Sequence, residues 1–164
     1  MRIALWTMAA TFLLDQATKL GVVFWLRLTD LGVIDVWPPY LTFRMAWNTG
    51  VNFGLFSHDA EIMRWVLVAV ALAISVWVWV WIRREGGGGP AQIAAGLLIG
   101  GALGNVVDRV VYGAVADFLN MSCCGIENPY AFNLADVAIF AGALGLVVFS
   151  GPKPAAGKKP PKTP

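Results

Sequence analysis

Hydrophobic residues in this chain gather into four long runs, separated by stretches in which polar residues are frequent. The runs cover about residues 3–26, 65–82, 91–107 and 133–150. An α-helix rises about 1.5 Å per residue, so about 20 apolar residues cross a hydrocarbon layer of about 30 Å. The pattern therefore predicts an all-α integral membrane protein with four transmembrane helices.

The longest polar interval, residues 27–61, contains a partly alternating, aromatic-rich segment with the sequence YLTFRMAW at residues 40–47. This pattern favours a short strand, and we expect a small β subdomain over about residues 38–58. The string that follows, Asn48 to Gly54, contains two glycines. It suits either a turn whose asparagines orient a substrate or a simple hairpin turn.

Composition supports the membrane assignment. Hydrophobic residues make up 58% of the chain and charged residues 13%, with a mean hydropathy of +0.67. Soluble domains carry about 25% charged residues. We expect one membrane domain over residues 1–150 and a disordered, Pro- and Lys-rich cytoplasmic tail over 151–164. No basic patch interleaved with aromatic residues suggests nucleic acid as a partner.

Cysteine and histidine are scarce. The two cysteines, Cys123 and Cys124, are adjacent, and neighbours in sequence rarely pair, so no disulfide framework is expected. His58 is the one histidine of the chain, and no cluster of metal ligands accompanies it. We therefore expect neither a metal nor a cofactor.

The basic residues set the expected orientation. Under the positive-inside rule, one group of cations marks the cytoplasmic side, which then holds both termini: Arg2, Arg83, Arg84, Lys153, Lys158, Lys159 and Lys162. The remaining polar loops and most of the acids then lie at the outer face.

Three acids at that face, Asp108, Asp117 and Asp136, lie beside or inside apolar runs, close to Asn105, Arg109 and Asn133. Charged residues in such places cost about 2.5–3.5 kcal/mol each on insertion scales and are usually functional. The alternative is a set of interfacial charges that pair with Arg109 and have no further role.

The first run contains a charged pair of its own. Asp15 and Lys19 lie four residues apart, on one face of a helix, and can form an ion pair. We expect this pair to fix helix packing and to support a nearby site.

Paired carboxylates without metal ligands or a nucleophile–histidine pair point to acid–base chemistry on water. Two carboxyl groups a few ångströms apart share one proton, so one can accept a proton from water while the other hydrogen-bonds a carbonyl. Ser57 and Ser122 lack a base, so serine catalysis ranks lower. Two other classes remain open: a small proton- or cation-coupled transporter or channel subunit, and a non-catalytic assembly factor.

Five strings, in this order, give the chain a specific resemblance to the lipoprotein signal peptidases, also called signal peptidase II. They are Asp15-Gln16-Ala17-Thr18-Lys19, Asn48-Thr49-Gly50-Val51-Asn52-Phe53-Gly54, Gly104-Asn105-Val106-Val107-Asp108-Arg109, Val115-Ala116-Asp117-Phe118 and Phe132-Asn133-Leu134-Ala135-Asp136. The resemblance extends from the first helix through the last and leaves the tail outside.

This resemblance implies a membrane aspartyl endopeptidase of the bacterial inner membrane with Asp117 and Asp136 as its catalytic dyad. Other residues would shape the site, bind substrate or support it: Asn48, Gly50, Asn105, Asp108, Arg109, Asn133, Asp15 and Lys19. The substrate would be a prolipoprotein cut just before its diacylglyceryl-modified cysteine, cradled by a small extracytoplasmic β-sheet. Membrane lipids and globomycin-type cyclic peptides are the other expected partners, and we expect a monomer.

Overall fold

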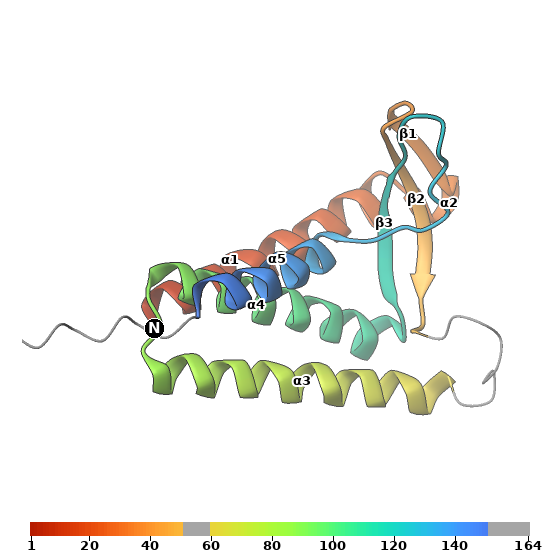
Figure 1. The fold of residues 1–164 in the computed structure, drawn as a ribbon. Coiled ribbons are helices and arrows are strands. Elements are labelled where there is room, and N and C mark those ends of the chain that lie inside the picture. Colours follow the sequence, from red (N-terminus) through yellow and green to blue (C-terminus); the bar gives the residue numbers. More distant parts are fainter. Residues whose placement is uncertain (51–59, 151–164) are drawn as a thin grey trace, which may run out of the picture.

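The computed structural model describes residues 1–50 and 60–150 of the chain. Helices form most of the structure, with a small sheet at one end (Figure 1). The elements follow in the order α1 (Arg2–Lys19), a π-helical continuation η1 (Leu20–Trp25), α2 (Leu28–Leu31), β1 (Val33–Trp37), β2 (Leu41–Asn48), α3 (Ala60–Glu85), α4 (Gly89–Tyr112), β3 (Val115–Met121) and α5 (Leu134–Phe149).

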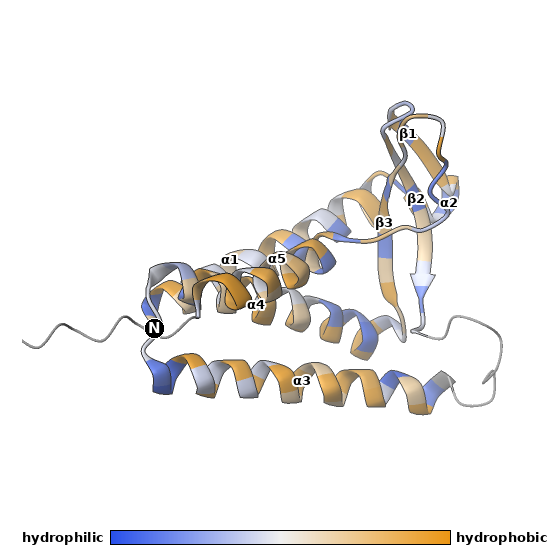
Figure 2. Cartoon of the chain, viewed as in Figure 1, coloured by the Kyte–Doolittle hydropathy of each residue, from blue (hydrophilic) through white to orange (hydrophobic). Residues whose placement is uncertain are grey.

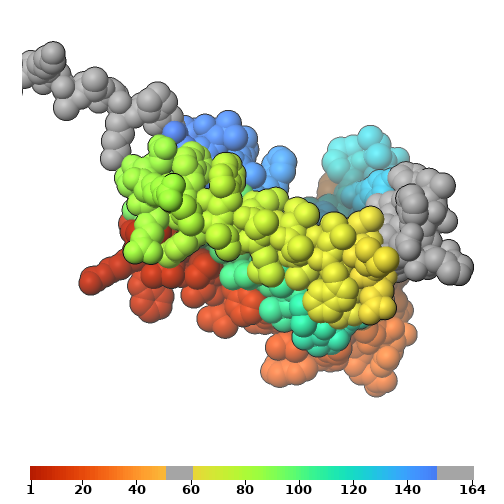
Figure 3. Space-filling model, turned by 90° about the horizontal axis from the view of Figure 1, so that it is seen from below, coloured from red at the N-terminus to blue at the C-terminus, as the bar shows by residue number. Residues whose placement is uncertain are grey.

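Helix α4 is the centre of the bundle. It packs against α1, α5 and α3, whereas α3 packs mainly on α4 and leaves most of its own surface exposed. Seen from the side of α3, this helix lies across the outside of the other helices (Figure 3). Hydrophobic residues dominate all four long helices, including outward-facing positions (Figure 2). An apolar exterior of this kind suits contact with lipid rather than water.

Two glycines let α1 approach α4 closely. A Cβ atom added to Gly100 would lie 2.5 Å from the carbonyl oxygen of Met8, and one added to Gly104 would collide with the Asp15 carboxylate. A side chain at either position would push the helices apart. The close approach of α1 at these glycines brings Asp15 against α4.

The sheet is antiparallel in the order β1-β2-β3. Strand β2 matches the strand predicted at residues 40–47. Strands β1 and β3 were not predicted as strands, and β3 carries Asp117, which faces Ala46 across the ladder. Buried residues of β3 and of the α1–α2 region form a small core under the sheet: Val23, Leu28, Ala116 and Phe118.

Two helices, Glu61–Glu85 and Gly89–Tyr112, are long and apolar enough to cross a membrane, and α5 is a shorter apolar helix. The predicted β subdomain extends to residue 58. Residues 51–58, which include Asn52, Ser57 and His58, lie outside the described residues, and so does the tail 151–164.

The expectation for the cysteines is wrong. Cys123 and Cys124 are joined by a disulfide, with their Cα atoms 3.7 Å apart. A tight turn, closed by backbone hydrogen bonds between Cys123 and Ile126, brings the two sulfur atoms together.

Candidate active site

Asp117 and Asp136 come from different elements at the end of the bundle that meets the sheet. Asp117 is buried in the middle of β3, and Asp136 lies in the first turn of α5. Asn133 is the N-cap of α5. Its Oδ1 accepts from the backbone N–H of Asp136, and the Asp136 carboxylate accepts from the backbone N–H of Asn133 in return. This capping box fixes where the Asp136 side chain points.

Side-chain amides connect the two acids, which we call the acid pair. Asn133 donates from Nδ2 to Asp117 Oδ1 at 2.6 Å and to Asn105 Oδ1 at 3.2 Å. Asn105 in turn donates from Nδ2 to Asp136 Oδ1 at 2.8 Å. The acid pair is thus held by neutral donors, and neither acid has a cation within ion-pair distance among the described residues.

The second oxygen of Asp117 is held from strand β2. Asn48 donates from Nδ2 to Asp117 Oδ2 at 3.0 Å, while its own Oδ1 accepts from the backbone N–H of Gly50 at 2.9 Å. Gly50 has φ = +79°, a conformation that L side chains rarely adopt. The turn therefore sets which end of the exposed Asn48 amide faces the acid pair.

Burial and the nearby charge of Asp136 raise the pKa of Asp117 from 3.8 to about 6, although the hydrogen bonds from Asn48 and Asn133 oppose the shift. A carboxyl group with a pKa near neutrality can exchange protons at physiological pH. Asp117 is therefore a member of the acid pair that can hold a proton near neutral pH.

A second group of charges lies beside the acid pair, and we call Asp15, Lys19 and Asp108 the Lys19 cluster. Lys19 Nζ lies 2.8 Å from Asp15 Oδ2, 2.7 Å from Asp108 Oδ2 and 3.2 Å from Asn105 Oδ1. Lys19 is 4% exposed, and both acids are at most 1% exposed. Every donor of the ammonium group thus has a partner in the interior.

The two acids of the Lys19 cluster hold the backbone just before each member of the acid pair. Asp15 Oδ1 accepts from the N–H of Ala135 at 3.0 Å, and Asp108 Oδ2 accepts from the N–H of Ala116 at 3.2 Å. The Lys19 cluster therefore ties α1 and α4 to the starts of α5 and β3. The expected ion pair between Asp15 and Lys19 is confirmed. The backbone contacts of Asp15 and Asp108 come in addition to it.

Among the described residues, Arg109 forms no ion pair with Asp108, Asp117 or Asp136, so the alternative in which these acids pair with it is wrong. Asp108 is occupied by Lys19, by the Ala116 N–H and by Gln16 at 3.2 Å. The charge of Arg109 still acts on Asp136, Asp117 and Asp108 from a greater distance. Its Nη1 donates to the carbonyl oxygen of Asn105 at 3.4 Å, and its buried Nε has no hydrogen-bond partner within residues 1–50 and 60–150.

Gln16 contacts both acids of the Lys19 cluster, and it was not identified as a site residue from the sequence. Its Nε2 donates to Asp15 Oδ2 at 3.1 Å and to Asp108 Oδ1 at 3.2 Å. A polar amide within an apolar helix, next to a charged pair, was the signal that could have identified it. Among the described residues, no three His, Cys, Asp or Glu side chains are grouped to hold a metal ion.

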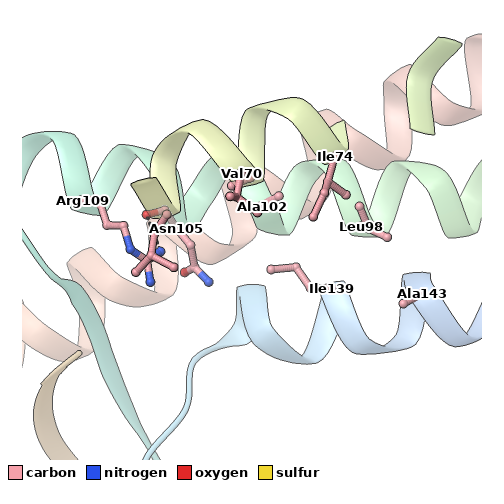
Figure 4. Close-up of a pocket in the computed structure, with 10 residues that line it drawn as sticks. Val70, Ile74, Leu98, Ala102, Asn105, Arg109, Ile139 and Ala143 are labelled. Carbon is pink, nitrogen blue, oxygen red and sulfur yellow. Dashed lines mark hydrogen bonds between the residues drawn. The ribbon is translucent and has the colours of Figure 1, made fainter. Parts of the chain in front are cut away.

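An apolar pocket of about 460 Å³ lies between the helices, and its lining includes Asn105, which donates to Asp136 (Figure 4). Its polar end consists of Asn105 and Arg109, and the rest is lined by α3, α4 and α5 through Leu67, Val70, Ala71, Ile74, Leu98, Ala102, Ile139 and Ala143. An elongated apolar group could therefore lie between the helices with its polar end near the acids.

Comparison with known proteins gives consistent matches over nearly the whole chain. The sequence profile of a peptidase family described as signal peptidase (SPase) II matches residues 7–150. A lipoprotein signal peptidase of Methylorubrum extorquens (strain PA1) is 45% identical over 151 residues, which are 91% of this chain and 85% of that protein. One from Nitrobacter hamburgensis is 36% identical, covering 92% of this chain and 93% of the relative.

Solved structures match the fold. A bacterial membrane enzyme determined by the in meso method at 2.3 Å resolution has a TM-score of 0.71 and 25% identity, covering 88% of this chain and 85% of the other. A second one, at 1.9 Å resolution, has a TM-score of 0.75 and 24% identity, with 88% and 90% covered.

Proposed function

The chain belongs to the signal peptidase II family, and we propose that Asp117 and Asp136 are its catalytic dyad. It is accordingly an aspartic peptidase of the bacterial membrane that removes signal peptides from prolipoproteins. The observation that carries the proposal is the continuous path of amides from Asp117 through Asn133 and Asn105 to Asp136. Neutral donors orient both carboxyls without removing the proton that they share.

The proposed reaction uses this shared proton. The ionised carboxylate accepts a proton from a water molecule, whose oxygen attacks the scissile carbonyl carbon, and the protonated carboxyl donates to the carbonyl oxygen. When the resulting diol collapses, the nitrogen of the leaving cysteine receives a proton and the C–N bond breaks. The dyad then again holds one proton. We place the cut just before a diacylglyceryl-modified cysteine.

The apolar pocket suits the lipid part of this substrate. Its walls come from membrane-facing helices, so an acyl chain entering it exchanges lipid contacts for similar protein contacts. The Arg109 guanidinium group and the neighbouring Asn105 lie at its polar end, where they can donate to ester oxygens of the diacylglyceryl group. A cyclic lipopeptide of the globomycin type would compete for the same pocket.

The remaining residues act through the dyad. Asn48 and Gly50 hold one oxygen of Asp117, and the Lys19 cluster holds the backbone beside each acid. Lys19 also fixes the Asn105 amide, because Asn105 Oδ1 accepts from Lys19 and Asn133 and so leaves Nδ2 for Asp136. We therefore assign positioning roles to Asp15, Lys19 and Asp108.

We further propose four membrane spans in one domain over residues 1–150, as a monomer. The four spans are α1 with η1, α3, α4 and α5. The 16 residues of α5 extend only about 24 Å, so this span requires a locally thin bilayer or a contribution from flanking residues. Arg83 and Arg84 at the end of α3 then face the cytoplasm, as do both termini. The acid pair, at the opposite end, faces outward.

The direct test is cleavage of a diacylglyceryl-modified prolipoprotein by purified wild type, Asp117→Asn and Asp136→Asn. We expect both variants to lose activity by a factor of about 10³ or more, while Asp30→Asn, an exposed acid paired with Arg27, keeps it. Chelator should have no effect. Full activity of either dyad variant would show that the substituted acid does not take part in the reaction.

A further inference from the structure

The free end of the sheet, farthest from the helices, carries a cluster of exposed apolar side chains. Two loops form this end: the β1–β2 turn and the segment after β3 (Figure 1). They are joined by the backbone N–H of Ser122, which donates to the carbonyl oxygen of Tyr40 at 3.2 Å. We call the exposed apolar residues of this end the tip patch: Val36, Trp37, Tyr40, Met121, Ile126 and Tyr130.

The tip patch is unusually exposed for residues of its kind. Trp37 is 68% exposed, Ile126 74% and Tyr130 70%, and the rings of Trp37 and Tyr40 contact each other at 5.6 Å. In a loop that faces water, polar side chains normally take these positions.

Here the polar side chains are turned inward instead. Asn120 donates from Nδ2 to the carbonyl oxygens of Asn128 and Tyr130, at 2.7 and 2.8 Å. Ser122 accepts from the backbone N–H of Asn128 at 3.1 Å. The loop thus satisfies its own backbone and leaves apolar groups outside, which is the arrangement required where water is scarce.

The chemistry of the tip is that of a membrane interface. Glu127 is the one charged residue in the segments 36–40 and 121–130. The Cys123–Cys124 disulfide lies in the same loop and leaves no thiol to ionise. Trp and Tyr with aliphatic neighbours and few charges are typical of the boundary between headgroups and acyl chains.

The direction of the sheet fits this partner. It stands away from the end of the bundle, steeply inclined to the helix axes, so a bundle that crosses a membrane carries the tip sideways at the level of the membrane surface (Figure 1). Exposed apolar residues also occur in the part of the chain that leads from η1 to β1: Trp25, Leu26, Leu31 and Val33. The chain between the bundle and the tip thus also carries exposed apolar side chains.

We propose that the tip patch inserts into the headgroup region of the bilayer and holds the sheet, with Asp117 on β3, at a fixed depth. This inference rests on the proposed membrane topology, but not on the proposed dyad. A lipid-modified cysteine lies at the bilayer surface, so a sheet fixed at that depth presents Asp117 where the scissile bond lies.

The test is the depth of a spin label at Ile126→Cys or, separately, Trp37→Cys, in a Cys123→Ser/Cys124→Ser background reconstituted in phosphatidylglycerol–phosphatidylcholine nanodiscs. Collision rates with oxygen and with a water-soluble nickel chelate report depth. Val76→Cys on the exposed middle of α3 and Glu85→Cys at its end provide the lipid and water references.

We expect both tip labels to give depths between the two references. A tip label as accessible to the chelate as Glu85→Cys would overturn the proposal, and so would a label shielded from both reagents with spin–spin broadening, which would indicate a second copy as the partner. Depth is measured without substrate, so this result is independent of whether the dyad variants cleave.

A functional measurement separates lipid contact from a role in folding or substrate binding. Tyr130→Glu should lower kcat/KM several-fold in nanodiscs and leave it unchanged in detergent micelles, which adapt to the protein surface. Thr29→Glu, an exposed polar position on α2, is the matched control. An equal loss in micelles and nanodiscs would contradict the proposal.

Discussion

The two groups of acids in this site differ in what holds them. Asp15 and Asp108 share the ammonium group of Lys19, whereas the donors to Asp117 and Asp136 among the described residues are amides and backbone N–H groups. An adjacent cation favours the ionised form of a carboxyl, whereas burial and the nearby charge of Asp136 raise the pKa of Asp117. The same residue type therefore serves packing in one group and acid–base chemistry in the other, and the partner decides which.

The difference between the two groups of acids should have its largest effect on stability at Lys19. We expect Lys19→Met to lower the free energy of unfolding by about 3–5 kcal/mol, because it leaves two buried acids without their cation. Thermal unfolding in detergent measures the loss. The double variant Lys19→Met/Asp108→Asn should regain part of it, since one unpaired charge is then removed; no recovery would argue against the charge-balance explanation.

The pH dependence of stability should report the raised pKa of Asp117. The pKa of folded Asp117 is about 6, above its ordinary value of 3.8, so the folded state retains a proton that the unfolded chain has released. The contribution of Asp117 is therefore fully present below about pH 4 and is lost as pH rises through 6, by roughly 3 kcal/mol at most.

Between pH 4 and pH 8, the free energy of unfolding should thus decrease less for Asp117→Asn than for wild type. An equal dependence of the free energy of unfolding on pH in both proteins would mean that Asp117 titrates like an ordinary carboxyl. The proposal of a shared proton would then be contradicted.

Asn133 should separate positioning from packing. Asn133→Ala removes the bridge between the two acids together with the N-cap of α5, so we expect kcat/KM to fall about 10²-fold while stability falls by only about 1 kcal/mol. Asn133→Ser keeps a capping oxygen and lacks the amide donor, so it should recover part of the stability without activity. Recovery of activity would show that the cap alone matters.

The smallest effect is expected at Asn48. Its exposed amide makes one hydrogen bond to Asp117, so Asn48→Ala should lower kcat/KM by up to about tenfold and leave stability nearly unchanged. Steady-state cleavage assays measure this. A loss as large as that of Asn133→Ala would place Asn48 at the reacting atoms.

Local patterns in the sequence predicted much of this arrangement. The apolar runs indicated the helices, the four-residue spacing indicated the Asp15–Lys19 ion pair, and the amides next to the acids indicated a site. The ion pair between Lys19 and Asp108 was not predictable, because it joins helices 89 positions apart and depends on their close approach at Gly104.

Strand β3 was also missed. Its sequence, VADFLNM, is buried on both sides and so lacks the alternation of a half-exposed strand. The disulfide was missed because adjacent cysteines pair only when a specific turn brings their sulfur atoms together.

The most direct test of the account compares four matched variants, Asp15→Asn, Asp108→Asn, Asp117→Asn and Asp136→Asn, for both cleavage and thermal unfolding. The account predicts that the last two lose cleavage and stay folded, while the first two unfold at lower temperature and lose activity only in proportion to the folded fraction lost. Full cleavage by Asp117→Asn or Asp136→Asn, or a stable but inactive Asp108→Asn, would contradict the assignment of chemistry to one group of acids and support to the other.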